Sequence, residues 1–144
     1  MDSYRALCVG ALVLLIVTTG CGSSGSNPKN VTVTVSPMSV TIPSSGQVTL
    51  QATVKGAPAP FANWTIAEMA INGASGAQCN WSGTTQPVGP CADGTIEGAD
   101  ASPALTVKYH APGTPGTFHV TAEWSTAFKP VVVKNATSVI TVGP

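Results

Sequence analysis

From residue 30 onward, apolar and polar side chains alternate with a period of two, and no helical period is sustained. This alternation is typical of strands that bury one face and expose the other, as the strands of antiparallel sheets do. We therefore expect half-buried antiparallel strands. The alternation is clearest in five runs: 31–36, 48–55, 105–110, 117–124 and 136–142.

Shorter apolar runs lie between these five, at residues 39–42, 62–66, 95–97 and 131–134. Turn-forming segments separate all of them at short intervals: SPM, PSSG, GAPAP, APGTPG and FKP. Seven to nine short strands separated in this way are typical of an all-β, immunoglobulin-like antiparallel sandwich. Helix is expected for at most one turn, near Ala67–Ala70.

The order of the motifs resembles a known family. The chain reads VTVTVSPMSVTIPSSGQVTLQATVKG, NWTI, CADGTIEG, LTVKYHAPGTPGTFHVTAEW and NATSVITV. This succession is similar to that of bacterial immunoglobulin-like (Big-type) surface domains and covers nearly all of residues 30–143. The resemblance implies an extracellular structural or adhesive module without catalytic residues. Many relatives carry tandem copies whereas this chain has one, which weakens a role as a spacer.

The first 20 residues differ from the rest and predict a signal peptide. Arg5 precedes an uncharged run, Ala6–Val17, and small residues follow. About a dozen apolar residues match the hydrophobic region of a secretory signal, whereas roughly 20 are needed to cross a bilayer as a helix. The alternative, a buried N-terminal helix, would have no helical partner downstream.

The signal ends in TTGC followed by GSSGSNP, which resembles the lipobox of bacterial lipoproteins. Thr18 stands where that family usually has Leu or another aliphatic residue. The resemblance implies that Cys21 becomes the first residue of the mature chain and carries several acyl chains, which together hold a protein stably on a membrane. We expect residues 21–29 to be the lipidated cysteine and its tether, and the protein to lie in the bacterial cell envelope, facing the periplasm or the cell surface. The alternative is plain secretion after a nearby cut.

The cysteine count agrees with export. Cys8 would leave with the signal, so the mature chain would keep Cys21, Cys79 and Cys91. An odd number in an exported protein needs an explanation, and lipidation of Cys21 supplies it. Cys79 and Cys91 are then expected to form a disulfide in an oxidising compartment. A redox or metal pair is the rival interpretation, although the pair lacks CxxC spacing and a nearby histidine.

Charge narrows the classes of partner. The net charge is zero and only 8% of residues are charged, so the chain lacks the surplus of Lys and Arg that an electrostatic nucleic-acid binder or a polybasic membrane-surface protein needs to meet phosphates. The hydrophobic content of 43% is enough for a packed core. We expect no nucleic-acid partner and no cofactor.

Few residues suggest catalysis or metal binding. His110 and His119 lie on the polar phase of strands expected in opposite sheets, so we expect them to be solvent-exposed rather than metal ligands. The carboxylates of Asp93, Glu97 and Asp100 suggest either a calcium site or a solvated turn, and their spacing does not match an EF-hand loop. No GxSxG elbow is present. We expect no enzyme activity.

The tryptophans divide into two groups. Trp64 and Trp124 lie on the inward phase and are expected in the core. Trp81 lies between the paired cysteines, beside Asn80 and Ser82, so either it forms an exposed contact loop or it folds back over the disulfide. The sequence therefore predicts a non-catalytic envelope lipoprotein with one structural or adhesive module, whose partner is an unknown protein or glycan. The alternative is a carbohydrate- or substrate-binding accessory lipoprotein.

Overall fold

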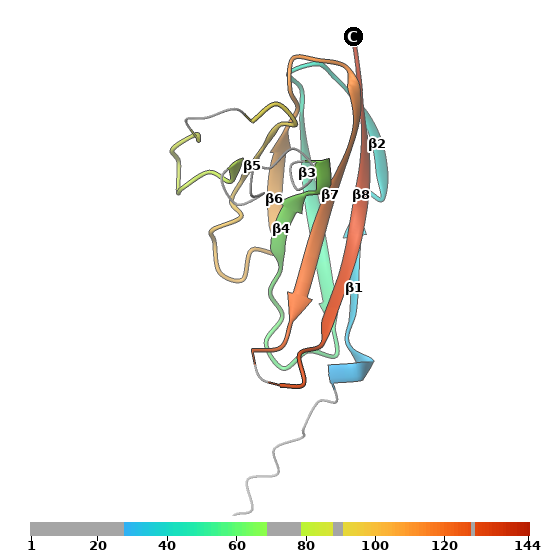
Figure 1. Cartoon of the computed structure of the whole chain (residues 1–144), viewed down its shortest axis with the longest axis vertical. Helices are drawn as coiled ribbons and strands as arrows, with labels where there is room; N and C mark the ends of the chain where they lie inside the picture. The colour runs from blue at the N-terminus through green and yellow to red at the C-terminus, as the bar shows by residue number, and fades with distance from the viewer. Residues whose placement is uncertain (1–27, 69–78, 88–90, 128) are drawn as a thin grey trace, which may run out of the picture.

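The computed structural model describes residues 28–68, 79–87, 91–127 and 129–144, and these form a two-layer β-sandwich (Figure 1). A short 3-10 turn, η1 (Pro28–Asn30), precedes the first strand. Sheet A has the order β1 (Thr32–Ser36), β3 (Gln47–Lys55), β6 (Thr106–His110), β5 (Thr95–Glu97). Sheet B has the order β2 (Ser39–Pro43), β8 (Val133–Gly143), β7 (Gly116–Ser125), β4 (Asn63–Ile66). The expected all-β, immunoglobulin-like sandwich is confirmed, with eight strands in the described residues.

The alternation seen in the sequence places the core. On β7 the inward residues Phe118, Val120, Ala122 and Trp124 are buried, and the residues between them are half-buried or exposed. One expectation was wrong. The runs 131–134 and 136–142 are not two strands but one, β8, because it pairs with β7 without interruption from Val133 opposite Ser125 to Val142 opposite Gly116.

A second correction concerns strand direction. All strands were expected to be antiparallel, but β2 runs parallel to β8, with Ser39 opposite Val139. The reason lies at Pro37, between β1 and β2. Proline has no N–H to donate to a sheet, and its carbonyl instead accepts a hydrogen bond of 2.7 Å from the buried hydroxyl of Ser138. The chain thus passes from the edge of sheet A to the edge of sheet B without reversing its direction.

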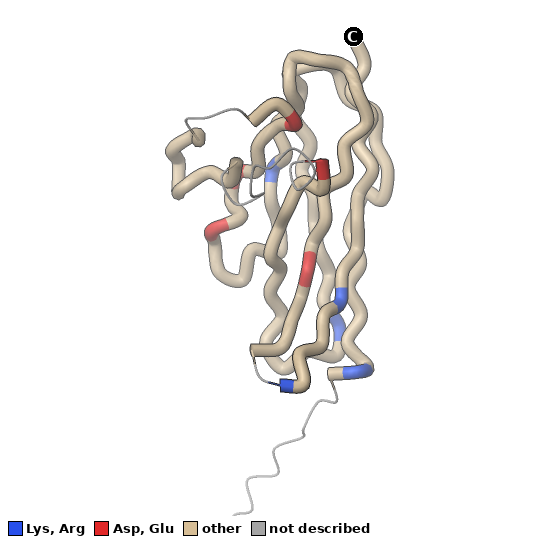
Figure 2. The backbone as a smooth tube through the Cα atoms, in the orientation of Figure 1, with Lys and Arg blue, Asp and Glu red and all other residues tan. Residues whose placement is uncertain are grey.

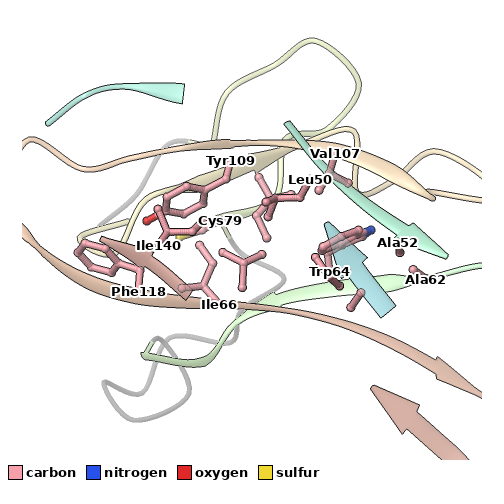
Figure 3. Packing of buried hydrophobic residues seen from close by; sticks show 14 of the residues in the cluster. Leu50, Ala52, Ala62, Trp64, Ile66, Cys79, Val107, Tyr109, Phe118 and Ile140 are labelled. Carbon is pink, nitrogen blue, oxygen red and sulfur yellow. The ribbon is translucent and has the colours of Figure 1, made fainter. Parts of the chain in front are cut away.

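The core fills the space between the two sheets (Figure 3). Leu50, Tyr109 and Ile140 have no exposed surface, and Trp64 is almost as deeply buried. The indole N–H of Trp64 donates a hydrogen bond of 2.6 Å to the carbonyl of Ala104, so the ring is buried with its polar atom satisfied. The expectation that Trp64 and Trp124 belong to the core is confirmed.

The described chain begins with η1 at one end of the sandwich, and the C-terminus lies at the other (Figure 1). The β7–β8 hairpin and the β3–β4 connection lie at the end where the chain enters. The expected signal peptide, Cys21 and most of the tether lie outside the described residues. Among the residues that are described, no helix is long and apolar enough to cross a membrane.

Candidate functional site

The most elaborate surface feature is the long connection from β4 in sheet B to β5 in sheet A. Cys79 and Cys91 form a disulfide within it, with Cα atoms 5.7 Å apart, so the expected pairing is confirmed. Cys79 is buried in the core cluster. The connection is therefore tied to the interior of the sandwich rather than hanging from its surface.

Of residues 80–82, the contact loop expected from the sequence, Asn80 and Trp81 lie against the outer edge of sheet A, whereas Ser82 pairs with Thr85. The backbone N–H of Trp81 donates a hydrogen bond of 2.8 Å to the carbonyl of Ile96, and Asn80 forms a parallel β-bridge with Ile96. The Asn80 side-chain amide also donates to the carbonyl of Trp64 at 3.4 Å. Open sheet edges invite unwanted pairing, and this segment covers the edge at β5.

The Trp81 side chain is half-buried and held from two sides. Its ring stacks on the imidazole of His110, with centroids 4.8 Å apart and planes 16° apart. Its indole N–H donates a hydrogen bond of 3.0 Å to the hydroxyl of Thr95. Trp81 thus lies against the outer face of sheet A, held by His110 and Thr95, instead of projecting alone into solvent.

Next to Trp81, three charged or titratable side chains converge. The Glu97 carboxylate oxygen Oε2 lies 2.8 Å from Nε2 of His110 and 3.2 Å from Nζ of Lys108. The hydrogen bond from His110, followed by that from Lys108, holds the pKa of the Glu97 carboxyl below its ordinary value. The carboxylate therefore stays ionised and lies at a fixed position on this face.

Glu97 and Lys108 also border a shallow depression on the outer face of sheet A, with a volume of about 290 Å³. This size is at the lower limit for sites that enclose small ligands. Hydroxyl, carboxylate and ammonium groups can exchange hydrogen bonds with a polar partner that lies across the surface. The lining residues are Thr49, Glu97, Gly98, Thr106, Val107 and Lys108.

A second histidine fixes the other end of the same connection. Glu68, just after β4, accepts a hydrogen bond of 3.0 Å from the backbone N–H of His119, and its carboxylate also contacts Nδ1 of the His119 ring. Burial raises the pKa of the Glu68 carboxyl, but the hydrogen bonds from His119 outweigh burial and lower it overall. The β4–β5 connection is thus attached to sheet B at Glu68 and to sheet A at Trp81.

The expectation that the two histidines lie on opposite sheets is confirmed, since they are on β6 and β7. The expectation that both are solvent-exposed was wrong for His110, whose side chain is 18% exposed, whereas the His119 side chain is 44% exposed. Each is bonded to a carboxylate. The sequence carries no signal for these pairs, because Glu68 and His119 are 51 positions apart.

Of the helical turn expected at residues 67–70, Ala67 and Glu68 are helical, and the remainder lies outside the described residues.

The turn after Cys91 has room for glycine alone. Gly94 has φ of +97°, and a Cβ added there would lie 2.5 Å from the carbonyl oxygen of His110 and 2.7 Å from the hydroxyl of Tyr109. That hydroxyl donates a hydrogen bond of 2.8 Å to the carbonyl of Asp93. Burial raises the pKa of Tyr109 far above its ordinary value, so the hydroxyl remains a donor.

The three carboxylates considered as a calcium site have separate surroundings. Glu97 contacts His110 and Lys108, whereas Asp100 accepts a hydrogen bond of 2.6 Å from the backbone N–H of Gly83. Across the described ranges, no three His, Cys, Asp or Glu side chains are grouped as a metal would require. Instead, Asp100 helps to hold the segment that carries Trp81.

Comparison with known proteins gives fold likenesses only. No protein-family model matches the chain, and no curated protein sequence matches it. A nucleoside hydrolase-related protein from Saccharophagus degradans, described as associated with carbohydrate metabolism, is similar over 74% of this chain and 22% of its own, with 14% identity and a TM-score of 0.46. A marsupial T cell receptor is similar over 78% of this chain and 52% of its own, with 13% identity and a TM-score of 0.41. The chain thus spans about a fifth and about half of these two structures.

Proposed function

We propose that this protein is a non-catalytic lipoprotein of the bacterial cell envelope, anchored through Cys21, whose immunoglobulin-like module binds a partner through the outer face of sheet A. We name this surface the Trp81 face; it comprises Trp81, His110, Glu97, Lys108 and the depression that Glu97 and Lys108 border. The partner is a protein or glycan met at close range, because a chain with no net charge exerts little long-range attraction.

One observation carries the proposal: the Trp81 ring is fixed on a sheet face before any partner arrives. Its backbone bonds to Ile96, its indole to Thr95, and its ring stacks on His110. Binding costs less when the contacting side chains are already ordered. Tryptophan is also among the residues most enriched where interfaces derive their affinity. Nearby threonines and an ionised carboxylate supply directional hydrogen bonds.

The partner is tested by photo-crosslinking in living cells. A crosslinking amino acid at Thr49, which lines the depression, is expected to give a specific adduct. The matched control is Thr141, an outward threonine on β8 in the other sheet. Adducts in equal yield at both positions, or at neither, would contradict the proposal.

The anchor is tested separately by intact mass. The processed protein is expected to carry acyl chains on Cys21 and to separate with membranes, and Cys21→Ala is expected to abolish both. A mature protein without acyl chains would overturn the lipoprotein assignment while leaving the Trp81 face to be judged by crosslinking.

The alternative, a carbohydrate-binding accessory lipoprotein, requires aromatic rings exposed in a row on one face. Within the described ranges, Trp81 is the one aromatic side chain on the outer face of sheet A, since Trp64 and Tyr109 point inward. A glycan array with wild type and Trp81→Ala distinguishes the two proposals. Binding that the substitution abolishes would favour the carbohydrate function.

A further inference from the structure

Most of the positive charge in the described residues lies toward one end of the sandwich (Figure 2). Four of the five lysines lie toward the end that carries η1 and the β7–β8 hairpin, and the fifth, Lys108, is on β6 between Thr49 and Glu97. Of the described carboxylates, Glu123 on β7 comes closest to these four, because it lies opposite Asn135, one residue from Lys134 on β8. The four lysines are Lys29, Lys55, Lys129 and Lys134.

The fold brings these lysines together from distant parts of the sequence. Lys29 belongs to η1, and Lys55 ends β3 opposite Thr32, the first residue of β1. Lys129 lies in the β7–β8 hairpin, and Lys134 is the second residue of β8. Because β1 and β8 both start at this end, the start of one and the hairpin of the other lie close together (Figure 1).

Exposed apolar side chains accompany the lysines. Val131 is 60% exposed in the hairpin, and Val133, the first residue of β8, is 47% exposed. These are two of the three most exposed large apolar side chains in the described residues. Lysines beside solvent-exposed apolar residues are typical of surfaces that lie at the boundary between lipid headgroups and acyl chains. We call the four lysines, Val131 and Val133 together the basic end.

The position of the tether decides which partner fits. Residues 22–27 separate Cys21 from Pro28, and even fully extended they reach no more than about 25 Å. An acyl-anchored Cys21 would therefore keep the start of η1, at the basic end, within about 25 Å of the membrane, whereas the opposite end of the sandwich could lie farther away. Anionic headgroups supply the negative charge that lysines attract.

We propose that the basic end docks on an anionic phospholipid surface and holds the sandwich upright on the membrane. This proposal rests on the lipid anchor of the proposed function. A zero net charge does not oppose docking, because charges separated by more than about 8 Å of physiological salt solution are largely screened. The carboxylates of the distal half therefore contribute little, and Glu123, beside Lys134 in the register of β7 and β8, offsets only one of the four lysine charges. The Trp81 face is held clear of the bilayer.

The experiment measures how deeply the hairpin lies in the membrane. The full-length lipidated protein is placed in vesicles of phosphatidylcholine, alone or mixed with phosphatidylglycerol, with an environment-sensitive fluorophore on Val131→Cys. We expect emission to shift to the blue, and quenching by a headgroup spin label, only when phosphatidylglycerol is present. The same fluorophore on Thr114→Cys, in the exposed β6–β7 turn at the other end, is expected to show neither.

Charge substitutions then test the cause. Each lysine near an anionic surface is worth roughly fivefold in binding, so Lys129→Gln with Lys134→Gln is expected to lower the ratio of docked to undocked protein roughly 25-fold. Thr114→Glu, which lowers the net charge at the opposite end of the sandwich, is expected to leave that ratio unchanged. Vesicle flotation distinguishes the two possible failures. Protein that does not float with vesicles contradicts the anchor, whereas protein that floats but gives the same Val131 signal in both lipids overturns the docking.

Discussion

Trp81 and His110 stack with ring centroids 4.8 Å apart, and this contact joins the disulfide-bonded segment to the outer face of sheet A. His110 also bonds to Glu97, so the aromatic ring and the carboxylate of the Trp81 face share one support. We therefore regard His110 as the residue that positions the candidate binding surface.

The Trp81–His110 contact is expected to contribute measurably to stability. A stacked aromatic pair is worth about 1 kcal/mol beyond the area that it buries. A double-mutant cycle with Trp81→Ala and His110→Ala, measured by urea unfolding, should therefore give a coupling energy of about 1 kcal/mol. A coupling energy of zero would mean that the stack does not stabilise the fold. It would also contradict the proposal that the Trp81 ring is fixed before a partner binds.

Gly94 is expected to be the less replaceable of the two glycines that the structure describes in the β4–β5 connection. Alanine there would combine φ of +97° with a Cβ 2.5 Å from the His110 carbonyl oxygen, so backbone atoms would have to move. Gly83 is the matched control, since its φ is +58° but nothing lies within 4 Å of an added Cβ. Gly83→Ala should cost about 1 kcal/mol in the free energy of unfolding, and Gly94→Ala clearly more. Equal losses in thermal unfolding would contradict this assignment.

The disulfide between Cys79 and Cys91 closes a loop with a sequence separation of 12. A loop of this size restricts the unfolded chain enough to stabilise the fold by about 3 kcal/mol. Cys79→Ala combined with Cys91→Ala is expected to lower the free energy of unfolding by that amount, measured with urea in parallel with the reduced wild type. If reduction left the unfolding midpoint unchanged, the cross-link would serve neither the fold nor the Trp81 face.

Acid is expected to weaken the fold in part through Glu68. The hydrogen bonds from His119 lower the pKa of Glu68 from its ordinary value of 4.5, so the folded state favours the ionised carboxylate. This contribution is therefore complete above pH 4.5 and is lost as the pH falls through the lowered pKa. Urea midpoints measured between about pH 3 and pH 7 should fall less steeply for Glu68→Gln than for wild type.

His119→Gln provides the matched test of that cause. It removes the ring contact to Glu68, so the urea midpoint should again fall less steeply with decreasing pH than in the wild type. The double variant should reduce this pH dependence no more than Glu68→Gln alone, because both substitutions act on one pair. If both single variants kept the pH dependence of the wild type, the pair would not control stability in acid.

Local pattern was enough to predict most of the fold. Alternation along residues 48–55 and 117–124 predicted β3 and β7, because a strand that buries one face must repeat every two residues. The same argument predicted that Trp64 would lie in the core. It failed at residues 131–142, where continuous pairing with β7 makes one strand from two runs. Strand length depends on the partner strand, which the local pattern does not specify.

What the sequence by itself determined was the half-buried strands, the inward tryptophans and the pairing of Cys79 with Cys91, because each follows from local periodicity or from a count. Only the tertiary structure decided that His110 supports Trp81, that His119 holds Glu68, and that four lysines gather at the tether end. These relationships join residues far apart in the chain. They depend on which strands become neighbours, and hydrophobic periodicity carries no information about that choice.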